Sequence, residues 1–345
     1  MRILVINCGS SSVKVSVFDG DTGLRENDVD RQPDVEMTMN EALKAMPLDG
    51  LQAVGHRIVH GGLRIQQTRK VDPEVKEAIR LGTELAPLHN EFAFEVLEEC
   101  EQRFSGVPQY AVFDSSFHAT IPARAAAYGL PVSYFEEGYR KFGFHGASHQ
   151  YASQVVAERL GRPLEELKMI TCHLGNGASV CAVLGGKSVD TSMGFTPDEG
   201  LLMGTRAGDI DSGLLIYLMK GRGWSVDRLR TLLLLESGLK GLSGIDKDMR
   251  KVEEAARSGD PHAVLAVDVF CYRVKKYIGA YFAVLNGLDV LVFMGGIGEH
   301  SETVRKRCTE GLEALGIREG GVPVMVVRAE EDLMIAREVL RILKG

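Results

Sequence analysis

Residues 3–18 read ILVINCGSSSVKVSVF and carry the pattern that decides the fold. The run Ile3–Ile6 is rich in strand-forming residues, and in Val13–Phe18 every second residue is a valine. Between them, Asn7–Ser12 are small or polar residues of the kind that favours a turn. The stretch therefore predicts a β-hairpin closed by a glycine- and serine-rich turn.

A second stretch repeats this arrangement near the middle of the chain. Ile170–Cys172 and Val180–Val183 bracket HLGNGAS at positions 173–179. Gly9 and Gly175 occupy equivalent places in the two hairpins. We interpret the pair as an internal duplication in which each half opens on a strand, a turn and a strand.

Helical patterns alternate with strand-like runs through the rest of the chain, which indicates an α/β protein. Helices are predicted to begin at Pro73 and at Asn90, and to cover Ala263–Leu285 and Leu333–Leu343. The length of 345 residues predicts two domains. Hydrophobic residues at 45% and charged residues at 25% exclude a disordered or fibrous protein.

Charge and hydropathy narrow the range of partners. The net charge of −7 repels nucleic acid and anionic membranes, so an anionic ligand needs locally placed basic groups. The long apolar stretch Ile278–Gly298 is interrupted by Asn286, Gly287 and Asp289, which predicts a core crossing and not a membrane span. The six cysteines form no CxxC pair and are read as free thiols of a cytoplasmic protein.

Three glycine-rich turns are candidate phosphate sites. The turns Asn7–Lys14 and His173–Ser179 offer backbone N–H groups and hydroxyls, although neither has Walker A spacing. The third, Gly295–Gly298, follows the strand-like run Leu288–Met294 and precedes a helix that Ser301 caps. An ordinary hairpin turn, or close packing of strand on helix, is the alternative for each turn taken alone.

Two arginines are candidate anion ligands, because a guanidinium binds carboxylate or phosphate bidentately. Arg57 lies near the end of a strand-like run, and Arg206 is flanked by small residues. The alternative is a surface arginine or an ion pair, for which Asp209 and Asp211 stand close to Arg206.

Histidines and acids complete the candidate set. The histidine pairs His56/His60 and His145/His149 have i,i+4 spacing but lack the HExxH pattern and a third ligand, so a zinc site is disfavoured. His145 is interpreted as a hydrogen-bond donor or as a buried histidine. Asp114 ends a strand-like run, where α/β sheets hold ligands. Glu330–Asp332 precede the last helix, where they suit either magnesium or the positive end of the helix.

Together these motifs resemble the acetate kinase family along the whole chain. The resembling segments, in the family's order, are Asn7–Lys14, Gly55–Gly62, Leu85–Asn90, Val112–His118, Phe142–His149, Thr171–Ser179, Gly186–Asp211, Ser237–Arg250, Gly295–Ser301 and Glu330–Arg337. The chain is shorter than a typical member between Asp19 and Gly55 and between Gly316 and Glu330.

The resemblance implies two ribonuclease-H-like domains around an interdomain cleft, the architecture of actin, Hsp70 and sugar kinases. The expected domains are 1–118 plus 334–345, and 119–333. The implied activity is reversible, direct in-line transfer of the γ-phosphoryl group of ATP to acetate, with Mg²⁺, in a cytoplasmic homodimer that binds neither nucleic acid nor membrane.

The resemblance also implies roles for individual residues. The catalytic positions are Arg57, Asp114, His145 and Arg206. The small apolar substrate pocket is Val59, Leu88, Phe144 and Pro197. The nucleotide and phosphate positions are Ser12, Lys14, His173, Gly175, Asn176, Gly177, Asp248, Met249, Arg250, Gly296, Ile297 and Gly298. The metal positions are Asn7 and Glu331.

These residue types suit the chemistry, because a carboxylate nucleophile is already ionised and needs no general base. Arginines, a histidine donor and magnesium supply the positioning and charge stabilisation that phosphoryl transfer requires. Propionate or butyrate kinase activity is the alternative within the class, since one methylene changes binding by only about 1–3 kcal/mol. An Hsp70- or actin-like ATP-binding switch is the alternative from another class.

Overall fold

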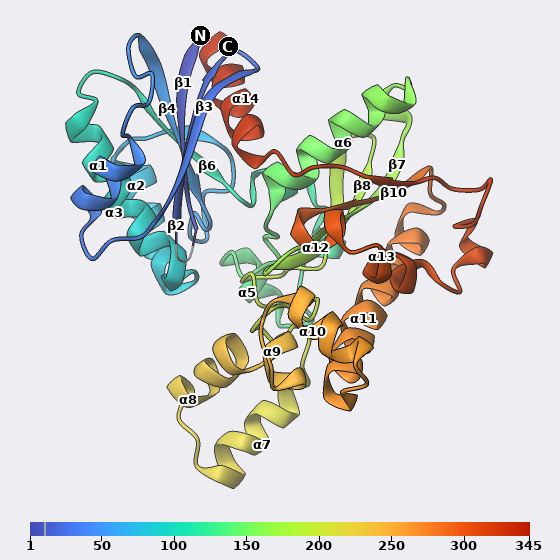
Figure 1. The fold of residues 1–345 in the computed structure, drawn as a ribbon. Coiled ribbons are helices and arrows are strands. Elements are labelled where there is room, and N and C mark those ends of the chain that lie inside the picture. The colour runs from blue at the N-terminus through green and yellow to red at the C-terminus, as the bar shows by residue number, and fades with distance from the viewer. Residues whose placement is uncertain (10–11) are drawn as a thin grey trace. The chain divides into compact units, whose positions relative to one another are not determined.

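The computed structural model in Figure 1 describes residues 1–9 and 12–345, apart from the side chains of Pro87 and Leu88. Within that part of the chain, no helix is both long enough and apolar enough to cross a membrane. The apolar stretch 278–298 divides into a helix and a strand, as predicted. Asn286 adopts a left-handed conformation with a φ of 51° and ends the helix there.

The described chain groups into two compact units. The first holds residues 1–119, 127–151 and 330–345, and the second holds residues 120–126 and 152–329. Residues 127–151, expected in the C-terminal domain, therefore pack with the first unit. The division into domains at 118/119 and 333/334 stays a prediction.

The first unit is built on a six-stranded sheet with the order β3-β2-β1-β4-β6-β5. The first three strands form an antiparallel meander, whereas β4 and β6 run parallel to β1. The strands are β1 (Arg2–Cys8), β2 (Ser12–Asp19), β3 (Thr22–Asp30), β4 (Leu51–Ile58), β5 (Arg69–Lys70) and β6 (Gln109–Phe113).

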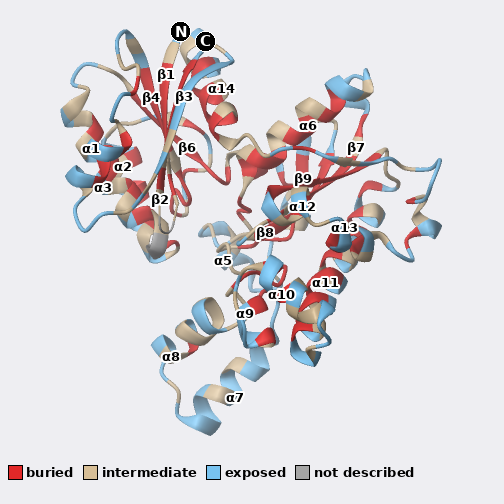
Figure 2. Ribbon diagram, in the orientation of Figure 1, coloured by how far each residue is buried: buried red, intermediate tan, exposed pale blue. Residues whose placement is uncertain are grey.

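Helices cover both faces of this sheet (Figures 1 and 2). Because side chains alternate along a strand, Leu4 and Ile6 pack with α1, α2 and α3, whereas Ile3 and Val5 pack against α14. The covering helices are α1 (Val35–Ala42), α2 (Pro73–Leu81), α3 (Pro87–Arg103) and α14 (Glu331–Lys344), and the unit also contains the short α5 (Val132–Glu136). The prediction that α3 begins at Asn90 is wrong, because proline suits a first helical position and the helix starts at Pro87.

The second unit has a five-stranded sheet with the order β11-β10-β7-β8-β9. Its strands are β7 (Lys168–Leu174), β8 (Ala178–Leu184), β9 (Lys187–Thr191), β10 (Val290–Met294) and β11 (Val324–Val326). Its longer helices are α7 (Ser212–Arg222), α10 (Met249–Arg257), α11 (Pro261–Leu285) and α13 (Glu302–Thr309). The shorter ones are α4 (Ala123–Ala126), α8 (Val226–Thr231), α9 (Gly238–Ser243) and α12 (Gly295–His300). The longer α6 (Gly146–Leu160) begins in the first unit and continues into the second.

The two sheets repeat one topology. The orders β3-β2-β1-β4-β6 and β9-β8-β7-β10-β11 both join an antiparallel meander to two parallel strands. In both hairpins the glycine after the first strand donates to a carbonyl close by: Gly9 N to Ser12 O at 2.8 Å and Gly175 N to Gly177 O at 2.9 Å. The predicted duplication and the ribonuclease-H-like α/β architecture are therefore confirmed. The predicted interdomain cleft stays a prediction.

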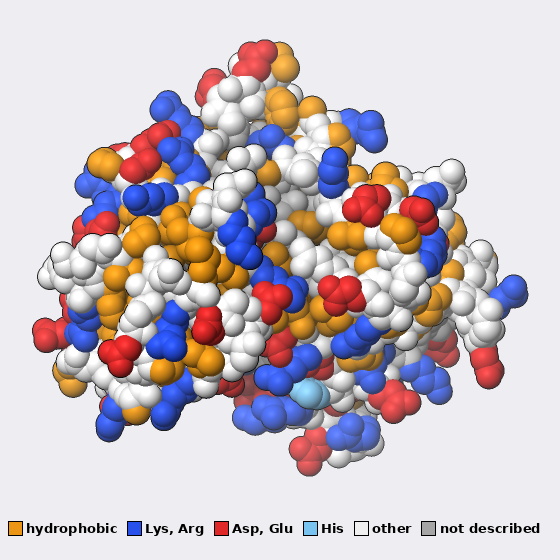
Figure 3. Space-filling view, turned by 90° about the horizontal axis from the view of Figure 1, so that it is seen from above, with side chains coloured by type: hydrophobic (Ala, Val, Ile, Leu, Met, Phe, Trp, Pro, Cys, Tyr) orange, Lys and Arg blue, Asp and Glu red, His pale blue; other side chains and the backbone are white. Residues whose placement is uncertain are grey.

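Basic and acidic side chains are interspersed on the face that Figure 3 shows, and neither sign gathers there into one large patch. This surface agrees with the modest net charge of −7. An anionic ligand on that face would have to be bound by individual basic groups and not by a broad positive field.

Candidate active site

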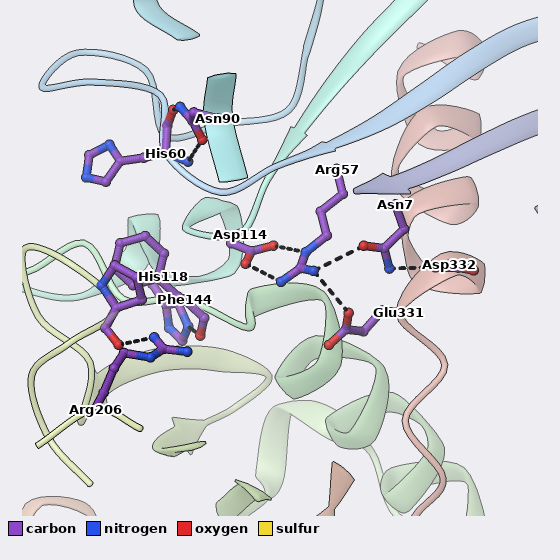
Figure 4. Close-up of polar contacts among 11 residues, drawn as sticks. Asn7, Arg57, His60, Asn90, Asp114, His118, Phe144, Arg206, Glu331 and Asp332 are labelled. Atoms are coloured by element: carbon purple, nitrogen blue, oxygen red, sulfur yellow. Dashed lines mark hydrogen bonds and ion pairs between the residues drawn. The ribbon is translucent and has the colours of Figure 1, made fainter. Parts of the chain in front are cut away.

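Arg57 and Asp114 form a bidentate ion pair in the first unit (Figure 4). Arg57 is the penultimate residue of β4 and Asp114 directly follows β6, so two neighbouring parallel strands bring them to one sheet edge. Arg57 Nε and Nη2 each donate to a different oxygen of the Asp114 carboxylate at 2.7 Å. The side chains are only 16% and 5% exposed, so the pair is shielded from water.

Two further groups surround the guanidinium. Arg57 Nη1 donates to Asn7 Oδ1 at 3.1 Å, and Glu331 Oε2 lies 3.9 Å from the same nitrogen. Burial lowers the pKa of Arg57, but Asp114 and Glu331 outweigh it and raise the pKa above its ordinary value. These hydrogen bonds use three of the five guanidinium N–H donors, which leaves two for a ligand that the described residues do not supply.

Asp332, which the sequence analysis named only as part of the acidic cluster 330–332, is buried. It accepts from Asn7 Nδ2 at 2.9 Å and from Ser16 Oγ at 2.7 Å, and Lys14 Nζ lies 3.3 Å from it. Burial lowers the pKa of Lys14, but Asp332 and Glu26 raise it above its ordinary value. Asp332 therefore holds the amide of Asn7 so that its oxygen faces Arg57.

A signal for Asp332 was present in the sequence. It lies three, four and seven residues before Ile335, Ala336 and Val339, all of which are buried against the sheet. An acid on the buried stripe of an amphipathic helix needs polar partners, because an unpaired buried charge is costly. Glu331, which was predicted to bind metal, is also in the first turn of this helix.

The segment around His145 is held in an unusual conformation. His145 has a φ of 58°, in the left-handed region that residues other than glycine seldom adopt. On one side, the carbonyl of Phe144 lies 2.9 Å from His118 Nε2, and on the other, Gly146 N donates to Asp114 O at 2.8 Å. A Cβ on Gly146 would approach Asp114 O to 2.3 Å, so glycine is required there. Asp114 thus holds both Arg57 and the backbone beside His145.

Two of the apolar positions predicted for the substrate pocket, Val59 and Phe144, are buried, whereas Pro197 is half-buried. Val59 is 5% and Phe144 1% exposed, and the ring of Phe144 lies 5.6 Å from that of His60. Asn90, which was not predicted, receives a hydrogen bond from His60 N at 3.1 Å and donates to His60 O at 2.6 Å. The side chain of Leu88 lies outside the described residues.

Arg206 lies in the second unit and has different surroundings. Its Nη1 donates to the carbonyl of Pro197, the fourth predicted pocket residue, at 2.6 Å. Asp198 Oδ1 is 3.8 Å from the same nitrogen. Burial lowers the pKa of Arg206, and Asp198 only partly opposes this effect. Arg206 is therefore a buried cation with weaker compensation than Arg57.

Two of the predicted phosphate turns meet at one sheet edge of the second unit. The turn 175–177 lies between Leu174, the last residue of β7, and Ala178, the first of β8. Residues 295–298, predicted as a turn, form the start of α12 and follow β10, whose last residue Met294 pairs with His173. Gly295 has a φ of 76° and its N–H donates to Glu299 Oε1 at 3.1 Å. Because parallel strands carry these turns, their N–H groups can serve one phosphate chain.

The other predicted nucleotide positions lie at the start of α10. Asp248 caps this helix by accepting from Arg250 N, and hydrogen bonds from Arg250 hold the pKa of Asp248 at about 2. The side chain of Arg250 is 88% exposed, whereas Met249 is buried. Glu253 accepts from Ser301 Oγ at 2.8 Å, which joins α10 to the segment after the glycine turn.

The oxygen donors around Arg57 suit a magnesium ion that arrives with a nucleotide. Among the described residues, no three His, Cys, Asp or Glu side chains converge to form a metal site. Mg²⁺ that is bound with phosphates needs only one or two carboxylates, the rest of its shell being phosphate and water. Glu331 and the amide of Asn7, with Asp114 and Asp332 behind them, fit that requirement.

Comparison with known proteins adds a second line of information. A model of the Acetokinase family matches residues 25–337. The acetate kinase of Caldicellulosiruptor bescii is 43% identical over 397 aligned positions, which cover 99% of this chain and 100% of the relative. That of Acetivibrio thermocellus is 41% identical and covers 100% of both chains. The alignments are longer than the chain's 345 residues, so these relatives carry segments that it lacks.

Solved structures of acetate and propionate kinases are similar to this chain over almost its whole length. A propionate kinase from Francisella tularensis has a TM-score of 0.89 and 36% identity, with 98% of both chains covered. The acetate kinase of Porphyromonas gingivalis has a TM-score of 0.87 and 34% identity, with 99% of both chains covered. A hexokinase from Thermus thermophilus, with a TM-score of 0.51 and 16% identity, shares the fold alone.

Proposed function

The chain belongs to the acetokinase family, and we propose that it transfers the γ-phosphoryl group of ATP reversibly to acetate, giving ADP and acetyl phosphate. It is accordingly a kinase with a carboxyl group as acceptor, and family membership favours this function over an actin-like switch. The observation that carries the proposal is the buried Arg57, which keeps two donors for a ligand beside acids suited to magnesium.

The acceptor attacks phosphorus directly, because its carboxylate is already ionised and no base has to remove a proton. The main barrier is repulsion between this anion and the triphosphate. Arg57 and Arg206 bind the acceptor and the moving phosphoryl group, and His145 donates a hydrogen bond to that group. Such preorganised donors act where charge spreads over the phosphoryl oxygens.

The remaining predicted residues bind ATP. The turn 175–177, residues 296–298 in α12 and the start of α10 receive the nucleotide, and Ser12 and Lys14 bind its phosphates. Asn7 and Glu331 would hold magnesium, which neutralises charge on the phosphates when it is bound. Asp114 keeps Arg57 in one orientation through its bidentate ion pair.

The length of the preferred acid is a separate question. Val59 and Phe144 are both buried, and we propose that with Leu88 and Pro197 they enclose the methyl group of acetate. Propionate is the second candidate, because the chain is as similar to a propionate kinase structure as to an acetate kinase structure. One methylene is worth only about 1–3 kcal/mol, so both acids are candidates for turnover.

We also propose that the protein is a cytoplasmic homodimer. All six cysteines are buried and unpaired, as is usual in a reducing compartment. The largely apolar α7 has no buried residue within the monomer, and its Ile216 and Tyr217 are 54% and 67% exposed. Such a face is stabilised when a second copy covers it.

A hydroxylamine-trapped assay with magnesium ATP and formate, acetate, propionate or butyrate tests the function. Acetate should give the highest turnover, and Arg57→Ala should lower kcat by about 10²–10³-fold, because a donor to the transition state is lost. The control is Arg80→Ala, since Arg80 is an exposed arginine paired with Glu77 and should be neutral. A wild-type protein that binds ATP but forms no acyl phosphate from any of the four acids would overturn the proposal.

A further inference from the structure

Arg206 lies in a loop that has neither helix nor strand but is extensively hydrogen-bonded. Gly204 N donates to Asn176 O at 3.0 Å, and Gly204 O accepts from Lys240 N at 3.0 Å. Thr205 O accepts from Ser237 N at 3.1 Å. The backbone before Arg206 is therefore held by the second hairpin turn and by the residues that lead into α9.

The side chain of Arg206 has few anchors of its own. Its described polar contacts are the carbonyl of Pro197 at 2.6 Å and the more distant Asp198 at 3.8 Å. Arg57, by contrast, is fixed by a bidentate carboxylate. The direction of the Arg206 guanidinium therefore depends on the backbone on both sides of it.

The backbone after Arg206 is held by two side chains of α11. Arg273 Nη1 donates to the carbonyl of Ala207 at 2.8 Å, and Tyr277 Oη donates to Asp209 Oδ2 at 2.8 Å. These two residues are four apart, so they project from one face of the helix. Asp209 is held further by Gly200, which donates to its Oδ1 at 2.8 Å and accepts from its N–H at 2.9 Å.

The loop needs such support, because its path is tight. Gly208 has a φ of 69°, and a Cβ at this position would lie 2.2 Å from Leu201 O. Burial, together with the charge of Asp209, raises the pKa of Tyr277, so its phenol stays protonated and remains a donor at neutral pH.

We infer that Arg273 and Tyr277 are positioning residues that orient Arg206 for phosphoryl transfer. The inference rests on the function proposed above for Arg206. Neither residue was predicted from the sequence, because α11 has the pattern of a buried helix and both residues lie more than sixty positions from Arg206 along the chain. In this role α11 supports the catalytic loop and also forms part of the core.

A double-mutant cycle separates this role from a general effect on folding. Tyr277→Phe should lower kcat about tenfold and leave the KM for ATP unchanged. In an Arg206→Ala background, the same substitution should change the residual kcat less than twofold, because there is no guanidinium left to orient. Arg273→Met should behave like Tyr277→Phe, whereas Arg273→Lys, which can still donate to Ala207 O, should recover most of the turnover.

The matched control is Tyr272→Phe on the same helix, because Tyr272 is 64% exposed and should be neutral. Circular dichroism of each variant is the check that it is folded. An equal loss of kcat from Tyr277→Phe in both backgrounds would overturn the inference and leave the proposed function intact. Normal turnover of Arg206→Ala alone would instead contradict the role proposed for Arg206.

Discussion

At the scale of single residues, the two arginines show how much depends on their partners. The sequence allowed Arg206 to pair with Asp209 or Asp211. In the structure Asp209 accepts from Gly200 and Tyr277, while Asp211 caps α7, so neither acid neutralises Arg206. Asp198, 3.8 Å from Arg206 Nη1, offsets only part of the charge, so the buried Arg206 can still bind an anion.

Two buried histidines predict how stability depends on pH. Burial lowers the pKa of His56 and of His118 from 6.5 to about 4. Between these values the unfolded chain takes up protons that the folded chain does not bind. The free energy of unfolding should therefore fall as the pH falls from 6.5 to 4, by up to about 3 kcal/mol per histidine.

Urea unfolding at a series of pH values measures this slope. The double variant with His56→Gln and His118→Gln should show a shallower fall over the same range. His262 is exposed, so His262→Gln serves as the control and should leave the slope unchanged. Identical slopes for the wild type and the double variant would show that other groups cause the acid sensitivity.

At the scale of elements, the close contact between α14 and the first sheet depends on a glycine. A Cβ at Gly55 of β4 would lie 2.9 Å from Val339 Cγ2 and 3.2 Å from Ile335 Cγ2. The helix can pack this closely only because β4 has no side chain at that position. The resembling segment Gly55–Gly62 thus contains a packing residue as well as a candidate catalytic one.

Gly55→Ala should accordingly lower the free energy of unfolding by about 1–3 kcal/mol, because the added methyl overpacks the interface. Combining it with Val339→Ala removes the nearest methyl, so the double variant should lose less stability than the sum of the two single variants. Chemical denaturation gives these values. Gly279→Ala in α11, where a Cβ meets nothing within 4 Å, should be neutral or stabilising. A Gly55→Ala protein as stable as the wild type would show that α14 can shift without cost.

At the scale of the whole molecule, the chain returns to its first unit at the end. Residues 152–329 belong to the second unit, yet α14 packs on the first sheet and supplies Glu331 and Asp332 to the Arg57 site. The core of the first unit therefore includes residues from both the beginning and the end of this sequence. Its core against α14 includes Ile335 and Val339, which are fully buried.

Deletion of residues 331–345 should therefore weaken the first unit selectively. Burial of each large apolar side chain contributes about 1.5–3 kcal/mol, so several such contributions are lost together. Hydrogen exchange should become faster for the amides of β1 and β4, while those of β7 and β8 keep their protection. Deletion of the exposed residues 344–345 alone is the control. Uniform loss of protection in both sheets would contradict the expected independence of the second unit.

The sequence by itself determined the two hairpins, their duplication, several of the longer helices and the classes of residue that bind an anion. These features follow from local periodicity and turn chemistry, which act over a few residues. It also placed Arg57 and Asp114 near strand ends. Adjacent parallel strands bring such ends together, so this part of the candidate site was within reach of prediction.

Only the tertiary structure decided which groups support the two arginines. Asp332 reaches Asn7 across more than three hundred positions, and Arg273 and Tyr277 reach the Arg206 loop from a helix that reads as core. No local pattern specifies such pairs, because each depends on how helices pack against sheets and loops. Hydrogen-bond partners that are distant in the chain are chosen by packing, and packing is a property of the folded molecule.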